Sequence, residues 1–262
     1  MTRNAFAGAI LLVEGDRDSR FWRARVDNNG CRIVLCGGKP QLIGGMLLVN
    51  ARGIPGVLAV LDPDLAGIVG PQTVIPNVLA PDAHDLESML FHSSAFNSVM
   101  AEYADPLLIA QQEQQSGRTI KELVIDRALP FARLRWWLAV TVSPCAFDRF
   151  KPGRFIDTRW IFREPEWLLE VSNATGFSVQ QIEAGLSASP AHSARDFCHG
   201  KDLIAITAAG LRQALGHTAP GDERVSAHFR ASLAQADLQA SALGIAITAW
   251  EHANSPYKIL RP

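Results

Sequence analysis

Short apolar runs alternate with helical patterns over the first hundred residues. Each run is too short for a helix and is bounded by turn residues, which predicts strands buried on both faces. Repeated strand–helix–strand units predict a parallel sheet with helices on both faces and right-handed crossover connections. The predicted strands cover residues 9–13, 31–36, 57–61 and 73–79, and the predicted helices cover 19–26, 41–52 and a segment that begins at Asp85.

Helical spacing dominates the second half of the chain. We interpret the polar stretch 111–117 as a loop or a helix end. We therefore expect an α/β, Rossmannoid domain over residues 1–105, followed by a mainly helical domain over residues 106–262 that binds substrate or a partner. The helices predicted in this half cover residues 165–170, 178–186, 202–215 and 224–252.

Acidic residues follow two of the predicted strands. The strand 57–61 ends at Asp62, and Pro63 prevents the ladder from continuing to Asp64. Glu14 follows the first strand in the same way. Because open α/β sheets bind ligands at the carboxyl ends of their strands, neighbouring strands would bring these acids around Mg²⁺ or Mn²⁺. The alternative is a solvated turn, since Asp and Pro are common turn residues.

A glycine pair and a lysine follow the second predicted strand. Gly37, Gly38 and Lys39 lack the spacing of a P-loop. They are interpreted either as a strand-to-helix turn or as a phosphate or oxyanion site in which Lys39 is catalytic.

Several acids are candidate helix caps. Asp16 or Asp18 is expected to cap the first helix, and Asp85 the helix that follows His84. Glu87, one turn inside that helix, is a candidate additional metal ligand. His84 is interpreted as either a general base or a structural hydrogen-bonding residue.

The segment 133–163 is locally basic, with seven Lys and Arg against two Asp. Trp and Phe residues are interleaved with these cations, which would suit a surface that stacks bases of a single strand or an RNA loop. The alternative is a core segment whose aromatic rings face inward and whose cations are solvated. The candidate substrate-binding residues are Arg133, Arg135, Arg149, Lys151 and Arg154.

Composition limits the class of protein. The 262 residues carry a formal net charge of −1, which excludes a uniformly basic nucleic-acid binder. The four cysteines contain no C-x-x-C pair, which argues against zinc and for reduced thiols in the cytoplasm. We find no signal-peptide pattern and no apolar run of about 18 residues, so we expect a soluble, cytoplasmic protein without a membrane span.

These motifs together resemble a known family. Residues 13–15 with Asp18 and Phe21, followed by Asp62 and Asp64 after an apolar strand, resemble the TOPRIM domain of topoisomerases, primases and OLD-type nucleases. Three further segments resemble one standalone TOPRIM-like branch of unknown function, which includes AriB, the effector subunit of the PARIS anti-phage system. These segments are residues 37–39, 84–87 and 199–203.

The resemblance implies roles for the acids. Glu14 would bind metal and act as general acid and base, and Asp62 and Asp64 would be metal ligands. The sequence departs from the family pattern after Asp64, where Leu65, Ala66 and Gly67 replace further acids, so a full second metal site is not implied.

We expect a Mg²⁺- or Mn²⁺-dependent endonuclease that cleaves RNA, such as tRNA, or DNA. The resemblance implies a toxic effector of an anti-phage defence system with an ABC-type or OLD-like ATPase as partner, and a homodimer is a further expectation. The alternative is a non-catalytic TOPRIM-shaped regulatory module that binds a partner ATPase. A third reading is a metal-dependent nucleotide transferase that uses Asp62 and Asp64 on a diphosphate.

Overall fold

The chain divides into two compact units, and the second interrupts the first. The sheet unit consists of residues 1–63, 71–82 and 233–262, and the helical unit consists of residues 64–70 and 83–232. These units divide the chain differently from the predicted boundary at residue 105. The computed structural model describes residues 6–70, 74–141, 147–216 and 220–261.

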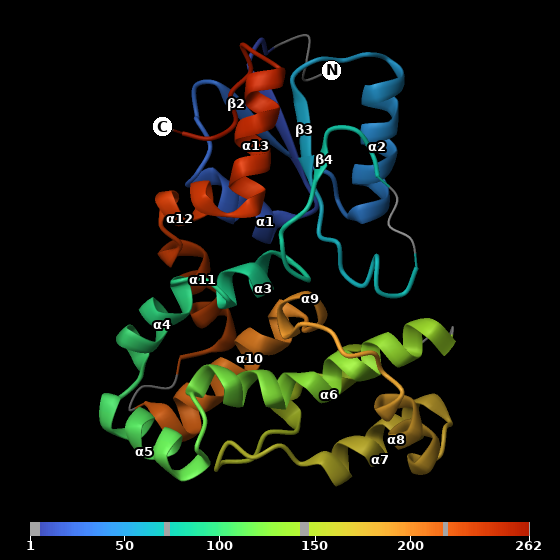
Figure 1. Ribbon diagram of the computed structural model, residues 1–262, viewed down its shortest axis with the longest axis vertical. Helices are drawn as coiled ribbons and strands as arrows, with labels where there is room; N and C mark the ends of the chain where they lie inside the picture. The colour runs from blue at the N-terminus through green and yellow to red at the C-terminus, as the bar shows by residue number, and fades with distance from the viewer. Residues whose placement is uncertain (1–5, 71–73, 142–146, 217–219, 262) are drawn as a thin grey trace. The chain divides into compact units, whose positions relative to one another are not determined.

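A four-stranded parallel sheet forms the centre of the sheet unit (Figure 1). The strand order is β2-β1-β3-β4, so the first strand is internal and all five of its residues are buried. Burial on both faces explains why this strand has an unbroken apolar sequence. The α/β class predicted for the N-terminal part is confirmed. The strands are β1 Ala9–Val13, β2 Cys31–Leu35, β3 Val57–Val60 and β4 Val78–Leu79.

Helix α2, residues Lys39–Ala51, covers one face of the sheet. Its buried Leu42 and Met46 belong to the same apolar cluster as Ile10 and Leu12 of β1. Successive residues of a strand point to opposite faces, so Leu11 faces away from α2. The other helices of the sheet unit are α1 Asp16–Arg23, α12 Gln235–Ala240 and α13 Ala242–Ala253.

The C-terminal segment returns to the sheet unit. Helix α13 contacts β4, and Trp250 donates its indole N–H to Oδ1 of Asn77 over 2.9 Å. Leu260 forms an antiparallel bridge with Val26. These long-range contacts pack the C-terminal segment against the N-terminal sheet. Local periodicity in the sequence does not predict this packing.

The single helix predicted over residues 224–252 is wrong, because the segment contains three helices. The first of them, α11, covers Asp222–Ser232, and α12 and α13 follow. Ser241 interrupts the pattern, since its side-chain oxygen accepts the backbone N–H of Gly244 over 3.0 Å and so begins α13.

Two N-terminal predictions differ from the structure at their ends. Helix α1 begins at Asp16 rather than Ser19, because the backbone N–H of Gly15 donates to Oδ2 of Asp18 and starts the helix one turn earlier. The fourth strand is limited to Val78–Leu79, and Thr73 of the predicted strand lies outside the described residues.

The helical unit confirms the mostly helical character predicted for the second half. Its longest helix, α6, packs in an apolar cluster with α7 and α8, and the polar stretch at 111–117 is the end of α5. In the part of the chain that the structure describes, no helix is both long and apolar enough to span a membrane. The remaining elements of this unit are α3 Leu86–Phe91, α4 Ala95–Tyr103, α5 Pro106–Ser116, α6 Ile120–Thr141, η2 Phe147–Phe150, η3 Pro152–Arg154, α7 Glu164–Thr175, α8 Val179–Ser187, α9 Ala194–Phe197, α10 Gly200–Gly210 and the π-helix η4 Leu211–Leu215.

Candidate functional site

Two acids meet at the carboxyl edge of the sheet. Glu14 directly follows β1, and Asp62 follows β3, which pairs with β1 in parallel register. The backbone N–H of Asp62 donates to Oε1 of Glu14 over 3.3 Å. The predicted neighbourhood of these two residues is therefore present within the sheet unit.

The turn after β2 is tied to the backbone of Glu14. The amides of Gly37 and Gly38 donate to the backbone oxygen of Glu14 over 3.1 and 3.0 Å. Both glycines have positive φ angles, +81° and +127°, a backbone conformation that side chains disfavour. Their amides thus orient the Glu14 backbone, and we find no support in these contacts for the predicted use of the amides as a phosphate cradle.

Lys39 lies at the same edge as the acids, as predicted. It begins α2, and its Nζ donates to the backbone oxygen of Asp62 over 2.7 Å. This hydrogen bond ties the ammonium group of Lys39 to the backbone of Asp62, at the edge of the sheet where Glu14 also lies.

The other two predicted metal ligands belong to the helical unit. Asp64 has φ +50°, a left-handed conformation that Asp tolerates, and its N–H donates to the backbone oxygen of His84 over 3.0 Å. Glu87 lies in the first turn of α3 and its exposed fraction is only 4%. Within the described ranges, no group of three or more His, Cys, Asp or Glu side chains could hold a metal ion.

Asp85 caps two helices of the helical unit at once. Its Oδ1 accepts the N–H of Ser88 over 2.7 Å, which confirms the predicted cap of α3. It also accepts the N–H of Gly200, the first residue of α10. Burial and the charge of the nearby Glu87 raise the pKa of Asp85 to about 7, even though the two N–H donors act to lower it.

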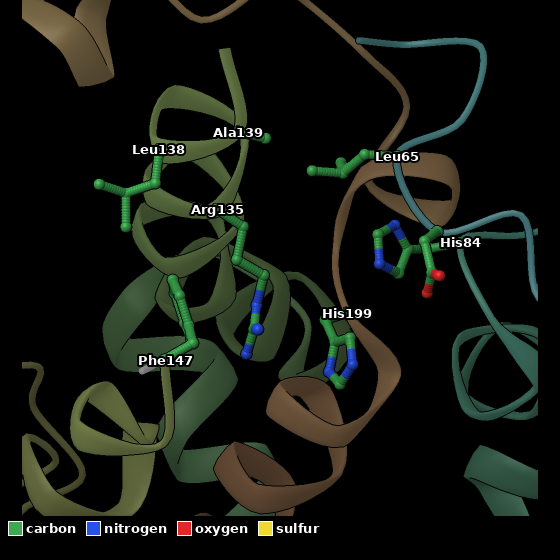
Figure 2. A pocket seen from close by; sticks show the side chains of 8 residues that line it. Leu65, His84, Arg135, Leu138, Ala139, Phe147 and His199 are labelled. Carbon is green, nitrogen blue, oxygen red and sulfur yellow. The ribbon is translucent and has the colours of Figure 1, made fainter. Parts of the chain in front are cut away.

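A pocket of about 350 Å³ lies beside this double cap (Figure 2). All of its lining residues belong to the helical unit. The rings of His84 and His199 meet edge to face, with centroids 5.6 Å apart, and Nε2 of His199 lies 3.8 Å from Oδ2 of Asp85. We call this cavity the histidine pocket, and it is lined by Asp64, Leu65, His84, Arg135, Leu138, Ala139, Phe147 and His199.

Arg135 is held rigidly in the wall of the histidine pocket. Its Nε and Nη2 donate to the carboxylate of Asp202 over 2.9 to 3.2 Å, and its guanidinium carbon lies 3.6 Å from the centroid of the Phe147 ring. Burial raises the pKa of the Asp202 carboxyl, although the pairing with Arg135 lowers it. Arg135, one of the predicted substrate-binding residues, is therefore committed to an ion pair with Asp202.

The remaining candidate substrate-binding residues are exposed, and most of the aromatic rings around them are not. Phe150, Phe155 and Trp160 are buried, and Trp137 belongs to the apolar cluster of α6. The interpretation of inward-facing rings is thus confirmed for these four aromatic residues, whereas binding of nucleic acid by the cations stays a prediction. The exposed cations are Arg133, Arg149, Lys151 and Arg154.

Cys31, Cys36 and Cys198 are free thiols. Burial raises the pKa of Cys31 and Cys198 to about 12, which makes these two thiols poor nucleophiles. Cys145 lies outside the described residues.

Local sequence patterns do not reveal the histidine pocket. Phe147 is one of many aromatic residues in its segment, and His199 lies more than a hundred positions after His84. The available signal was the pair of His-containing motifs at 84–87 and 199–202, each of which begins a helix. Compared with known protein families, curated proteins and solved structures, the chain matches none.

Proposed function

We propose that this protein is a metal-dependent nuclease that hydrolyses phosphodiester bonds in nucleic acid. The hydrogen bond from Asp62 N–H to Glu14 Oε1 is the observation that carries the proposal. It brings two acids from neighbouring parallel strands to the carboxyl edge of an α/β sheet, where such folds bind their ligands. The resemblance of the same residues to the TOPRIM domain supports the same chemistry.

The donors at this edge suit a hard divalent cation. Mg²⁺ takes oxygen ligands, keeps several waters and is commonly bound through one or two carboxylates. Glu14 and Asp62 therefore suffice as the protein ligands for Mg²⁺ or Mn²⁺. Asp64 and Glu87 remain predicted further ligands, and the proposal does not depend on them.

Each residue at this edge of the sheet would have a different role in hydrolysis. A bound divalent cation would neutralise charge on the scissile phosphate and lower the pKa of a water molecule. Glu14 would accept a proton from that water as general base. Lys39, whose Nζ lies 2.7 Å from the backbone oxygen of Asp62, would stabilise negative charge that develops on the phosphate.

The biological setting rests on the TOPRIM resemblance. We propose a toxic effector in anti-phage defence that acts in the cytoplasm, cleaves RNA such as tRNA or DNA, and is held or released by an ABC-type or OLD-like ATPase. A homodimer is part of the same proposal.

The test is cleavage by the purified chain with Mg²⁺ or Mn²⁺ and pools of tRNA, plasmid and single-stranded DNA. Glu14→Gln should lower the rate by about 100-fold or more, because it removes the general base and one ligand charge. Asp16→Asn is the matched control, since Asp16 is an exposed acid two positions away that forms an ion pair with Arg20. Equal rates for the Glu14 variant and the parent protein would contradict the proposal.

One observation favours a second candidate, a non-catalytic TOPRIM-shaped module that binds an ATPase. Oε1 of Glu14 already accepts the Asp62 amide, which is also what a purely structural glutamate would do. For the module, Glu14→Gln should change neither toxicity in cells nor binding to the partner ATPase. For the enzyme, the variant should lose toxicity and retain partner binding.

A further inference from the structure

We propose that the histidine pocket binds one unpaired nucleobase of the substrate, and that guanine fits it best. The inference deepens the proposed nuclease function and rests on it for the class of substrate. All residues that line the pocket belong to the helical unit and none is Glu14 or Asp62, so its binding can be measured without cleavage.

The size of the pocket suits a single base. Pockets for small ligands have volumes of about 300–1,000 Å³, and the 350 Å³ of the histidine pocket falls near the lower limit. That volume is of the size that a single nucleoside requires. A nucleotide would therefore enter from a loop, an end or a single strand, where bases are unstacked.

The walls combine an apolar side with a polar side (Figure 2). Leu65, Leu138 and Ala139 supply aliphatic surface. The stacked pair of Arg135 and Phe147 supplies a flat guanidinium plane that is already fixed in position. Aromatic rings and guanidinium planes are the surfaces on which proteins stack unpaired bases.

The polar side offers both acceptors and donors. Asp64 is an acceptor when ionised, Arg135 is only a donor, and the imidazoles of His84 and His199 can act as either. In the part of the chain that the structure describes, Nη1 of Arg135 makes no hydrogen bond, while Nε and Nη2 are occupied by Asp202. Guanine matches this arrangement because its N1–H and N2–H groups can donate to the carboxylate of Asp64, and its O6 and N7 can accept from the N–H groups of the imidazoles.

Charge favours a neutral heterocycle over a phosphate. The positive charge of Arg135 is paired with Asp202, whose side chain is 7% exposed, and the carboxylate of Asp64 also lines the pocket. A phosphate would therefore meet an acid and find no uncompensated arginine.

Ala139 allows the pocket to be blocked with little risk to the fold. It is an exposed residue of α6 that lines the pocket, so Ala139→Trp adds a large ring at the cavity without replacing a core side chain. Ala110→Trp, on the exposed surface of α5, is the matched control because the same change is made at a helical alanine that does not line the pocket.

The experiment measures binding of guanosine, adenosine, cytidine, uridine and inorganic phosphate to the full chain by titration calorimetry, with EDTA present to remove divalent metal. Guanosine should bind with one-to-one stoichiometry and more tightly than the other four compounds. Ala139→Trp should weaken guanosine binding by at least about tenfold, and Ala110→Trp should leave it unchanged. Asp64→Asn, which retains a residue compatible with positive φ, should reduce the preference for guanosine.

Three results would overturn the inference: no nucleoside saturates the protein, Ala139→Trp binds guanosine as the parent does, or phosphate binds as tightly as guanosine. The outcome is separable from that of the nuclease proposal. Guanosine binding without cleavage in any condition would contradict the nuclease and support the pocket. Cleavage that depends on Glu14, without any nucleoside binding, would support the nuclease and contradict the base-binding pocket.

Discussion

Gly200 donates its backbone N–H to Oδ2 of Asp85 over 2.9 Å, and this contact joins two segments that are 115 positions apart. A Cβ atom at position 200 would overlap the backbone of Ser88 and the carboxylate of Asp85. Glycine is therefore required by close approach, since helices α3 and α10 begin at the same buried carboxylate. The His84 and His199 rings meet because these two helix starts meet.

We predict that Gly200→Ala destabilises the protein by about 2 kcal/mol or more, because the added methyl forces backbone apart at a buried contact. Urea denaturation measures the free energy of unfolding. Gly44→Ala is the control, since a Cβ there meets nothing within 4 Å and alanine favours the helix. Equal destabilisation by both changes would contradict the packing argument.

Replacing only one partner of the ion pair between Arg135 and Asp202 should lower the free energy of unfolding. Arg135→Met leaves the carboxylate of Asp202 buried without its partner, which is expected to cost about 3–5 kcal/mol in the free energy of unfolding. Adding Asp202→Asn should restore part of that loss, because the buried charge is then removed as well. A double-mutant cycle in urea measures the coupling, and strictly additive losses would show that the pair is not coupled.

His92 should make the protein sensitive to acid. Burial, together with the charges of Lys121 and Arg195, lowers the pKa of its imidazole from 6.5 to about 4. The folded state therefore binds fewer protons than the unfolded state between these values, so stability is lost as pH falls from about 6.5 to about 4. The loss is at most about 3 kcal/mol.

His92→Leu removes the titrating group and should flatten that part of the stability profile. Urea denaturation across the same pH range measures the slope for both proteins. A variant whose stability falls as steeply as that of the parent would show that other groups cause the acid sensitivity.

Lys39→Met should reduce nuclease activity by about 100-fold, because a cation at the acid pair is lost. The rate of cleavage under saturating substrate is the measurement. Lys258→Met, which removes an exposed lysine from the same unit, is the control and should retain activity. If both variants cleave at the parental rate, Lys39 has no role in the reaction.

The exposed cations predict a salt-dependent affinity for nucleic acid. A residue that contacts a phosphate should, when replaced, weaken binding and reduce by about one the slope of log affinity against log salt concentration. We expect this effect for Arg133→Ala, Arg149→Ala and Arg154→Ala. Fluorescence anisotropy at several salt concentrations measures both quantities. Arg52→Ala, an exposed arginine of the sheet unit, is the control with the same change in charge. A uniform small loss for all four variants would indicate only an effect of net charge.

The order of residues along the chain predicts the α/β class of fold and the acids that follow the strands at one edge of the sheet. An apolar strand that is buried on both faces is visible in its own residues, as in Leu11 and Leu58, and the acid after it must lie at the strand end. The strand–helix–strand order predicts parallel strands, which places Glu14 and Asp62 at the same edge of the sheet. Their neighbourhood further requires that β1 pair directly with β3, and the strand order of the folded sheet supplies that pairing.

Tertiary structure decided which distant segments meet. No periodicity connects Asp85 with Gly200, Arg135 with Asp202, or Trp250 with Asn77, because each contact depends on the path of the chain through the whole unit. The histidine pocket therefore could not be derived from local patterns, since its walls come from four separate parts of the sequence. Strand ends and helix caps depend on residues that are close in sequence, so they can be predicted from it. A cavity is the space between packed segments, and it forms only when distant parts of the chain fold together.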